Sequence, residues 1–234
     1  MSANGRLSVG IIGAGPVGVI LGLALAGAGH AIVGITAVSQ ENRERAEAML
    51  PEVPLMDVAE ILQTADLIIL AIPDAELLPT VNGFAEAGLW HAGQIVAHTS
   101  PEYGYSVLAP ATAQGAIPLA IHPAMRFTGT SVDLIKLPDA YFAVSAPKIA
   151  LPIAQALVIE MGGEPVIVEE EARAKYAEAY SVASSFSAMV VNQAIGLLEE
   201  AGVENPRALL APVVRTAVEQ ALAEGHQPLD PEAL

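Results

Sequence analysis

Apolar and polar residues along the first 170 positions follow two periods in turn. Short runs rich in Val, Ile, Leu and Ala, typical of strands, are each followed by a stretch whose apolar residues have helical spacing. Strands that alternate with helices in this way form a parallel sheet with helices on both faces. The predicted strands lie near residues 7–13, 31–38, 66–72, 93–98, 117–121, 140–145 and 164–168, and the predicted helices lie over 16–28, 40–49, 56–63, 75–88 and 148–161.

The pattern changes after residue 170, where the strand signal ends. Apolar residues recur at helical spacing from Ala172 to about Ala201. A second helix is expected to begin at Asn205-Pro206 and to end at Gly225, since proline is favoured in the first turn of a helix and glycine just after its end.

These patterns predict two domains. The first is an α/β domain over residues 1–170, with a Rossmann-like, doubly wound, mostly parallel sheet, and the second is a smaller all-helical domain over residues 171–234. A helix of about thirty residues is long for a globular protein, so we expect it to pack against a second copy of the chain in a homodimer. Its apolar stripe comprises Tyr176, Ala179, Tyr180, Ala183, Phe186, Val190, Ala194 and Leu197.

A glycine pattern marks the end of the first predicted strand, where the chain reads SVGIIGAGPVG. At such a position Gly13 permits a tight turn, Gly15 lets the backbone approach a diphosphate, and Gly18 lets the helix pack closely on the strand. Pro16 and Val17 begin the helix, whose first N–H groups and positive dipole end favour phosphate. We therefore expect these five residues to bind a dinucleotide.

Two other interpretations of this segment are a secretory leader and a membrane span, because no charged residue lies between Arg6 and Glu41. A leader usually has a more basic start than the single Arg6. A membrane span does not usually begin with β-branched residues followed by Gly-Ala-Gly-Pro. A Rossmann-like fold without a cofactor is a third alternative, and the dinucleotide interpretation is favoured over all three.

Two further segments are expected to lie at the cofactor. Ile72-Pro73-Asp74 follows a run that is apolar on both strand faces, and His98-Thr99-Ser100 ends the next strand along the chain. Ligands of doubly wound sheets bind in the crevice outside the carboxyl ends of the strands. We expect Ile72, Pro73, Asp74 and Thr99 to contact the cofactor.

The residues after the second strand bear on which cofactor is bound. A protein that prefers NAD usually places Asp or Glu there, against the ribose hydroxyls. Here Ser39 occupies this region and Arg43 follows four residues later, an arrangement that suits a 2′-phosphate. The sequence thus favours NADP over NAD, although Arg43 on a solvated helix face, or Glu41 as a displaced ribose ligand, would fit the same residues.

Composition narrows the class of protein. The 234 residues are 53% hydrophobic and 15% charged, enough apolar material for a large core. The absence of cysteine excludes disulfides and a cysteine nucleophile, and no spacing of potential ligands indicates a metal site. The formal net charge of −16 argues against nucleic acid or an anionic membrane as a partner. A cytoplasmic protein with a small-molecule substrate is expected.

Several segments together resemble a known family. They are the glycine pattern, Ala71-Ile72-Pro73-Asp74, His98-Thr99-Ser100 with Gly104, the run from Ala120 to Met125, and Phe127-Thr128-Gly129-Thr130. They look like uncharacterised oxidoreductase-like proteins that join a Rossmann-like NADP-binding domain to a helical domain of unknown function. The resemblance implies kinship with 6-phosphogluconate dehydrogenase, pyrroline-5-carboxylate reductase and ketopantoate reductase, whose helical second domains commonly dimerise.

Candidate catalytic residues follow from the chemistry of hydride transfer, which needs a group that polarises or protonates a carbonyl or imine. His122 is the first candidate, followed by His98 and by the hydroxyl of Ser100. Each histidine could instead be a buried structural residue at a strand end. The resemblance adds Lys175, because related dehydrogenases carry a catalytic lysine on this helix, although a lysine in the first turns of an acidic helix is usually a solvated ion-pair partner, here of Glu171 or Glu178.

Departures from the family pattern leave two functions open. Pro101 stands where the family usually has glycine, Ala177 follows Tyr176 where it has histidine, and Ser185 replaces an asparagine. The family's final Gly-Pro and Arg-Gly-Asp stretch is absent before Leu234, which predicts either a truncated chain or an incomplete site. The first function is an NADP-dependent oxidoreductase acting on a small carbonyl, imine or hydroxy acid at the domain junction. The second is a catalytically degenerate NADP(H)-binding sensor or regulator.

Overall fold

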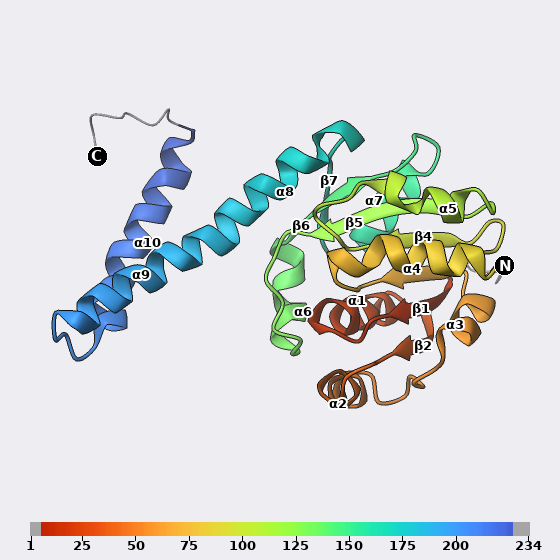
Figure 1. Ribbon diagram of the computed structural model, residues 1–234, viewed down its shortest axis with the longest axis horizontal. Helices are drawn as coiled ribbons and strands as arrows, with labels where there is room; N and C mark the ends of the chain where they lie inside the picture. Colours follow the sequence, from red (N-terminus) through yellow and green to blue (C-terminus); the bar gives the residue numbers. More distant parts are fainter. Residues whose placement is uncertain (1–5, 227–234) are drawn as a thin grey trace. The chain divides into compact units, whose positions relative to one another are not determined.

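The computed structural model describes residues 6–226, and its first part is built around a seven-stranded sheet (Figure 1). The strands are β1 (Ser8–Ile12), β2 (Ala31–Thr36), β3 (Leu67–Leu70), β4 (Ile95–His98), β5 (Ile117–Pro123), β6 (Tyr141–Ser145) and β7 (Glu164–Ile167). Their order across the sheet is β2-β1-β3-β4-β5-β6-β7. All seven predicted strands are therefore confirmed.

All pairs of neighbouring strands are parallel except β5 and β6, so the prediction of a mostly parallel sheet is confirmed. A parallel neighbour requires the chain to cross back over a face of the sheet. Between β5 and β6 the chain forms only α6 (Val132–Lys136) and the short 3₁₀-helix η2 (Leu137–Asp139). It stays at the carboxyl end of β5, where Ala124 donates its N–H to the carbonyl of Tyr141, so β6 returns antiparallel.

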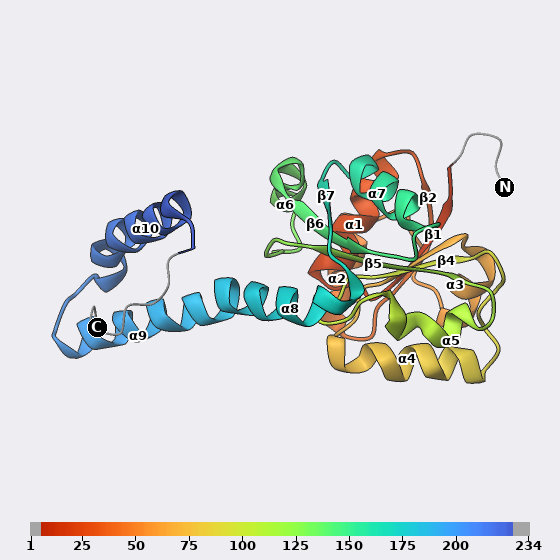
Figure 2. The ribbon, with the colours of Figure 1, turned by 90° about the horizontal axis from the view of Figure 1, so that it is seen from above.

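Helices cover both faces of the sheet (Figure 2). One face packs against α1 (Pro16–Gly27), α2 (Gln40–Met49) and α7 (Leu151–Glu160), and the other against α3 (Val58–Thr64), α4 (Asp74–Glu86), η1 (Tyr105–Leu108) and α5 (Ala109–Thr112). The five helices predicted in this part of the chain are all present. Because β3 is buried along its whole length, apolar side chains on both of its faces enter the two cores.

The order of the first strands creates a site for a ligand. The chain passes from β1 to β2 on one side and then returns to β3 on the other side of β1. At such a switch point the connections leave the carboxyl ends of β1 and β3 in opposite directions, and ligands of doubly wound sheets bind at this position. The turn after β1 lies at this position.

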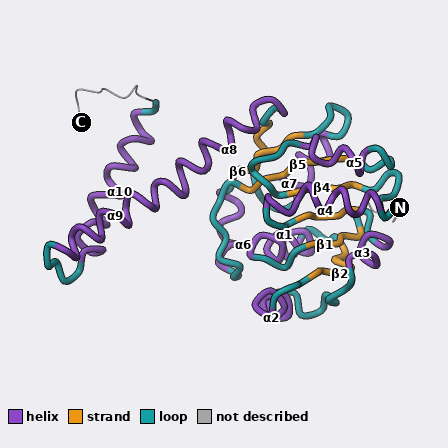
Figure 3. Tube along the Cα trace, in the orientation of Figure 1, coloured by secondary structure: helices purple, strands orange, loops and turns teal. Residues whose placement is uncertain are grey.

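The chain forms two compact units, Met1–Glu178 and Ala179–Leu234. The predicted boundary lay at residue 170, before η3 (Glu170–Ala172) and α8 (Arg173–Ser181). The second unit contains α9 (Ser187–Glu200) and α10 (Pro206–Glu224), drawn in purple in Figure 3. Asn205 accepts a hydrogen bond from the N–H of Ala208 and Gly225 follows the last turn of α10, as predicted.

The predicted thirty-residue helix is interrupted by a π-helical turn over Val182–Phe186. Two hydroxyl groups bond carbonyls there: Ser184 Oγ donates to Tyr180 at 2.7 Å, and Ser187 Oγ donates to Val182 at 3.2 Å. Such bonds compete with the regular helical ladder and favour local departures from it.

An exposed apolar surface characterises the helical run Glu170–Glu200. Its 31 residues include a window with mean hydropathy 1.3 and no buried residue, so by length and composition it is able to cross a membrane. Length and composition alone do not establish a span, because exposed apolar faces also form subunit interfaces. The expected absence of a membrane partner stays a prediction.

Candidate functional site

The turn between β1 and α1 can be built only with glycine at two positions. Gly13 has φ of 109°, and a Cβ atom there would lie 2.3 Å from the carbonyl oxygen of Ala71. A Cβ on Gly18 would lie 2.0 Å from the carbonyl oxygen of Gly13. Both contacts are far inside van der Waals distance and involve backbone, which has little freedom to move. These two glycines therefore fix the shape of the turn.

Gly15 differs from these two glycines, because a Cβ atom there would meet nothing within 4 Å. It precedes α1, which starts with Pro16, has no side chain capping its first turn and has no acidic residue there. The N–H groups of Val17 and Gly18 lie in that first turn, where the helix supplies no acceptor. Space beside Gly15 and uncapped donors fit a diphosphate, which these residues could hold.

Other residues surround this turn. A Cβ on Gly13 would lie 3.3 Å from Ile72, so the loop after β3 borders it. Pro73 and Asp74 form the start of α4, so the N-terminal end of a second helix directly follows the loop after β3. The structure thus brings Ile72 to the glycine turn, as expected, while Pro73 is exposed and Asp74 is half-buried.

A loop that was not singled out for a role also lies here. A Cβ on Gly129 would lie 2.8 Å from Arg45 Nε and 3.2 Å from Pro16 Cα. The fully buried Asp133 holds this loop, since its carboxylate accepts the N–H groups of Thr128 at 2.7 Å and Gly129 at 2.8 Å. The loop after β5 is therefore fixed beside the start of α1.

The residues after β2 differ in their placement from the sequence expectation. Ser39 is the N-cap of α2, and its hydroxyl accepts the N–H of Asn42 at 3.2 Å. Arg43 is exposed, whereas Arg45 reaches the turn and donates to the carbonyl of Ala14 at 3.4 Å. Arg45 also pairs with Glu41 at 2.6 Å. Of the two arginines, Arg45 is the one that contacts the glycine turn.

His98 has both ring nitrogens engaged by backbone. Its Nδ1 accepts the N–H of Ser100 at 3.2 Å, so Nε2 carries the proton and donates to the carbonyl of Gly104 at 2.9 Å. The side chain is fully buried. The hydroxyl of Ser100 is also engaged, because it accepts the N–H of Glu102 at 3.1 Å. Both side chains therefore hold the loop after β4 in place.

Glu170, which lies near the end of the first unit in sequence, holds the loop after β4 in place. Its carboxylate accepts the N–H groups of Tyr105 at 2.9 Å and Ser106 at 3.1 Å. A Cβ on Gly104 would lie 2.0 Å from this carboxylate, so a side chain there would displace Glu170 from its present position. The contact joins residues 65 positions apart and was not anticipated from the sequence.

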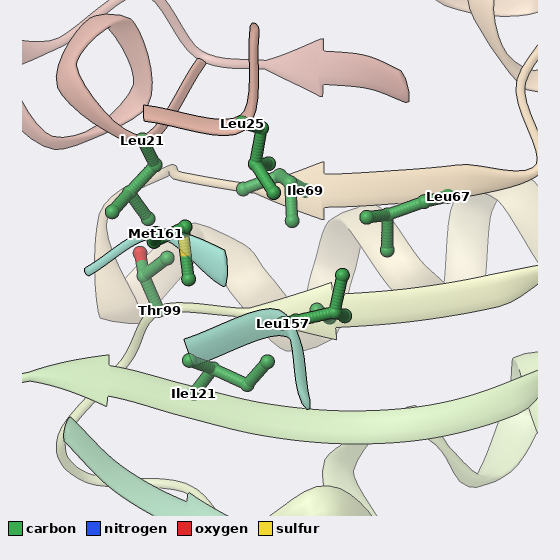
Figure 4. A pocket seen from close by; sticks show the side chains of 9 residues that line it. Leu21, Leu25, Leu67, Ile69, Thr99, Ile121, Leu157 and Met161 are labelled. Carbon is green, nitrogen blue, oxygen red and sulfur yellow. The ribbon is translucent and has the colours of Figure 1, made fainter. Parts of the chain in front are cut away.

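Thr99 lies on the opposite face of the sheet from His98. It lines an apolar hollow between the sheet and helices α1 and α7 (Figure 4), and its hydroxyl donates to the carbonyl of Leu70 at 3.5 Å. Thr99 thus lies beside the apolar core at the carboxyl end of β4, and its expected contact with the cofactor stays a prediction. The other lining residues are apolar: Leu21, Leu25, Leu67, Ile69, Ala97, Ile121, Leu157 and Met161.

His122, at the end of β5, meets a residue from α8. Its Nδ1 lies 2.7 Å from the hydroxyl of Tyr176, and the two rings pack edge to face with centroids 5.6 Å apart. Ile121 belongs to the core beside α1, so the alternation along the strand turns His122 to the same face as His98. The structure thus brings the first-ranked candidate to a phenol.

Arg173 lies one turn before Tyr176 on α8 and is only 2% exposed. Its Nη2 donates to the carbonyl of Ala143 at 3.3 Å, and its Cζ lies 5.4 Å from the centroid of the Tyr176 ring. Nε and Nη1 are buried without a hydrogen-bond partner. Sequence reasoning missed Arg173. The available signal was its spacing of three residues from Tyr176. That signal did not distinguish Arg173 from a surface residue, because a helix with many charged residues is usually solvated.

Lys175 is exposed, in contrast to these neighbours. Two residues along an α-helix correspond to about 200° of rotation, so Lys175 lies on the side of α8 opposite Arg173. Within the first unit the structure does not bring it to His122, and the candidate based on related dehydrogenases is not supported by this placement.

His98, His122, Arg173 and Tyr176 form a group that we call the Arg173 cluster. Its electrostatics keep both histidines neutral. Burial, together with the positive charge of Arg173, lowers the pKa of His122 to about 3. Burial lowers the pKa of His98 to about 4, despite its hydrogen bond to Gly104, and Arg173 adds to the lowering. Burial also lowers the pKa of Arg173. His122 therefore has a pKa well below the ordinary value for histidine, and its part in proton exchange stays a prediction.

Two family models match the chain. Residues 2–123, more than half of it, match the model described as a Rossmann-like domain, and residues 140–229 match the model described as a domain of unknown function, DUF2520. No curated protein matches the chain in sequence. The two models confirm the expected pairing of domains, and the second begins before β6, within the sheet.

Solved structures with the same fold include reductases. A Bacteroides fragilis protein described as a candidate NADP oxidoreductase has a TM-score of 0.74 at 18% identity, over 97% of this chain and 83% of that one. The imine reductase of Streptomyces aurantiacus has 0.67 at 20%, over 92% and 74%. Pyrroline-5-carboxylate reductase of Coxiella burnetii has 0.64 at 14%, over 95% and 82%. The likeness establishes the fold.

Proposed function

The chain belongs to the Rossmann-like domain family, and on that premise we propose that it is an NADP-dependent oxidoreductase acting on a small carbonyl, imine or hydroxy acid. The observation that carries the proposal is the contrast between the glycines of the first turn. Gly13 and Gly18 leave no room for a side chain, whereas Gly15 faces open space beside the uncapped start of α1. An opening kept free of side chains next to free N–H groups suits a diphosphate.

The chemistry is assigned to the pair formed by His122 and Tyr176. When bound, a reduced nicotinamide supplies a hydride to the acceptor carbon. The Tyr176 hydroxyl donates the proton that the substrate oxygen or nitrogen requires, and the Arg173 cation near its ring stabilises the negative charge left behind. His122 is neutral at pH 7 and orients the hydroxyl through the 2.7 Å hydrogen bond. His122 is thus a positioning residue in this proposal.

NADP is the proposed cofactor, for two reasons. The five residues from Thr36 to Gln40 include no Asp or Glu that would bind ribose hydroxyls and repel a phosphate. Arg45 lies at the glycine turn and Arg43 lies exposed two residues before it, so a 2′-phosphate would find a guanidinium group near the end of β2. NAD is the less favoured alternative.

The test is a titration of the purified chain with NADPH and NADH, followed by absorbance-monitored oxidation against a panel of keto acids and imines. The expected result is NADPH binding and turnover of at least one acceptor. NADPH binding without turnover of any acceptor would support the regulatory alternative, and failure of both nucleotides to bind would contradict the proposal. The position of the substrate at the domain junction stays a prediction.

We also propose that the second unit forms a homodimer. Large apolar side chains on its first helical segments are about half or more exposed: Val182, Phe186, Met189, Val190 and Leu197. A second copy that covers them would remove this surface from water. Sedimentation of the wild type should give a dimer, and Val190→Glu with Leu197→Glu should give a monomer. A wild type that sediments as a monomer at high concentration would contradict this.

A further inference from the structure

The guanidinium group of Arg173 is the least satisfied buried group in the cluster described above. Nε and Nη1 are buried and have no hydrogen-bond partner, while Nη2 donates to one carbonyl. Natural structures leave few buried donors unpaired, and those that remain are found at strained positions, at functional positions or beside a bound water or ion. A buried positive charge without an anion is more costly still.

The neighbouring groups do not neutralise Arg173. Glu170 is the carboxylate that acts on it electrostatically, but this carboxylate is committed to the N–H groups of Tyr105 and Ser106. The remaining neighbours are neutral: the ring of Tyr176 and the imidazoles of His98 and His122. No salt bridge to Arg173 occurs among residues 6–226. Among these residues the guanidinium group therefore has no anion in direct contact and two donors to offer one.

We propose that Arg173 binds a carboxylate of the substrate, next to the His122–Tyr176 pair. This inference rests on the proposed oxidoreductase function and narrows its substrate class to oxo acids and imino acids, in which a carboxylate lies one bond from the reacting carbon. A monoanion fits because the cluster holds one cation. A phosphate dianion would leave excess negative charge near Glu170, in a chain whose net charge is already −16. Planar carboxylates also match the donor geometry of a guanidinium group.

The position of Arg173 supports a carboxylate close to the reacting carbon. Arg173 and Tyr176 are three residues apart on one helix, so they present their side chains on the same face. The Tyr176 hydroxyl is the proposed proton donor, and the guanidinium carbon lies 5.4 Å from the centre of its ring. A substrate that receives the proton at its oxo or imino group thus brings an adjacent carboxylate within reach of Arg173.

The test uses oxamate, which has the shape of a small oxo acid but is not reduced, and oxamide, its neutral counterpart. Both are titrated calorimetrically into the full-length chain with and without NADPH. The expected result is that wild type binds oxamate at least tenfold more tightly than oxamide. Arg173→Gln should abolish the preference for oxamate and weaken its binding about 30-fold, and Arg173→Lys should retain part of it. Arg207→Gln, which removes an exposed arginine of the second unit, should bind oxamate as wild type does.

A second variant keeps the test decisive if Arg173→Gln does not fold. Glu170→Gln removes the negative charge near Arg173 and keeps one acceptor oxygen, for the N–H of either Tyr105 or Ser106, so oxamate should bind more tightly. Bound oxamate should also raise the pKa of His122, because the anion offsets the charge of Arg173. An NMR titration of His122 measures this pKa. A purely structural Arg173 would leave that pKa unchanged when oxamate is added.

Several outcomes would overturn the inference. These are equal binding of oxamate and oxamide by wild type, unchanged oxamate binding in Arg173→Gln, or weaker oxamate binding in Glu170→Gln. NADPH binding is measured in the same samples. If the wild type binds NADPH but does not prefer oxamate, only the carboxylate site is overturned. If the wild type does not bind NADPH, the proposed function itself is overturned.

Discussion

The glycine turn and the Arg173 cluster lie at the carboxyl ends of strands in the same sheet but are built in opposite ways. The turn uses backbone and small residues from one continuous segment, Gly13 to Gly18, and has no charged side chain of its own. The cluster uses buried polar side chains from three separate elements, β4, β5 and α8. The first suits a group that many proteins bind in the same way, and the second suits recognition of one substrate class.

The largest effect is expected at the turn, from two alanine substitutions that separate fold from binding. Gly18→Ala places a Cβ 2.0 Å from the Gly13 carbonyl and should lower the free energy of unfolding by about 3 kcal/mol or more, with loss of NADPH binding. Gly15→Ala should cost less than about 1 kcal/mol yet weaken NADPH binding at least tenfold, because its methyl group enters the open space. Urea denaturation and calorimetry measure the two quantities. Wild-type NADPH affinity in Gly15→Ala would place the diphosphate elsewhere.

The next effect concerns the cluster, through removal of one hydroxyl group. Tyr176→Phe should lower kcat by about 10²-fold, the usual contribution of a positioned proton donor, and leave the Kd of NADPH unchanged. Tyr141→Phe, at an exposed position on β6, is the matched control and should behave as wild type. Steady-state kinetics with the best acceptor from the panel gives both values. An unaffected kcat in Tyr176→Phe would assign proton transfer to another group.

Acid should weaken the cluster specifically. Because burial lowers the pKa of His98 from 6.5 to about 4, the folded protein binds fewer protons than the unfolded chain between these pH values. The free energy of unfolding therefore falls as the pH falls from 6.5 toward 4, by about 2 kcal/mol at pH 5 for this residue. Urea denaturation at pH 7 and pH 5 should show a pH dependence that is smaller by this amount in His98→Gln. Equal pH dependence in the two proteins would mean that His98 is not buried as a neutral ring.

The smallest effect tests which arginine recognises the cofactor. Arg45→Ala should weaken NADPH binding about tenfold and leave NADH binding nearly unchanged, since the loss of one phosphate contact costs about 1.4 kcal/mol. Arg43→Ala is the paired variant, because its side chain is exposed and makes no contact with the turn. Nucleotide titration compares them. A larger effect of Arg43→Ala would restore the assignment based on sequence spacing.

The sequence was informative for features that depend on neighbouring residues. The strands, the glycine turn and the ends of α10 were predicted because each is set by hydrophobic period, turn chemistry or helix capping over a few positions. The helical run after residue 170 was also predicted, but not the π-helical turn within it. That turn is accompanied by hydroxyl-to-carbonyl bonds of Ser184 and Ser187, which compete with a helical pattern that looked uniform.

The candidate site was only partly predictable. His98 and His122 were predicted as site residues. The sequence does not show, however, whether backbone groups bind the ring nitrogens of a histidine, as they do at His98. Lys175 was named and Arg173 was not, although the two are separated by one residue. Which of them faces inward depends on how α8 packs against β5, and both fit the same helical pattern.

The amino-acid sequence by itself determined the parallel sheet, the glycine turn and the acidic, cysteine-free character of the chain. Only the tertiary structure decided that β6 runs antiparallel, that Arg45 rather than Arg43 reaches the turn, and that Tyr176 joins His122 beside a buried Arg173. The physical reason is the separation along the sequence of the residues whose interactions decide each feature. Backbone conformation follows from interactions over a few residues, whereas burial, charge and hydrogen bonding of these side chains arise from contacts between segments about 30 to 75 positions apart.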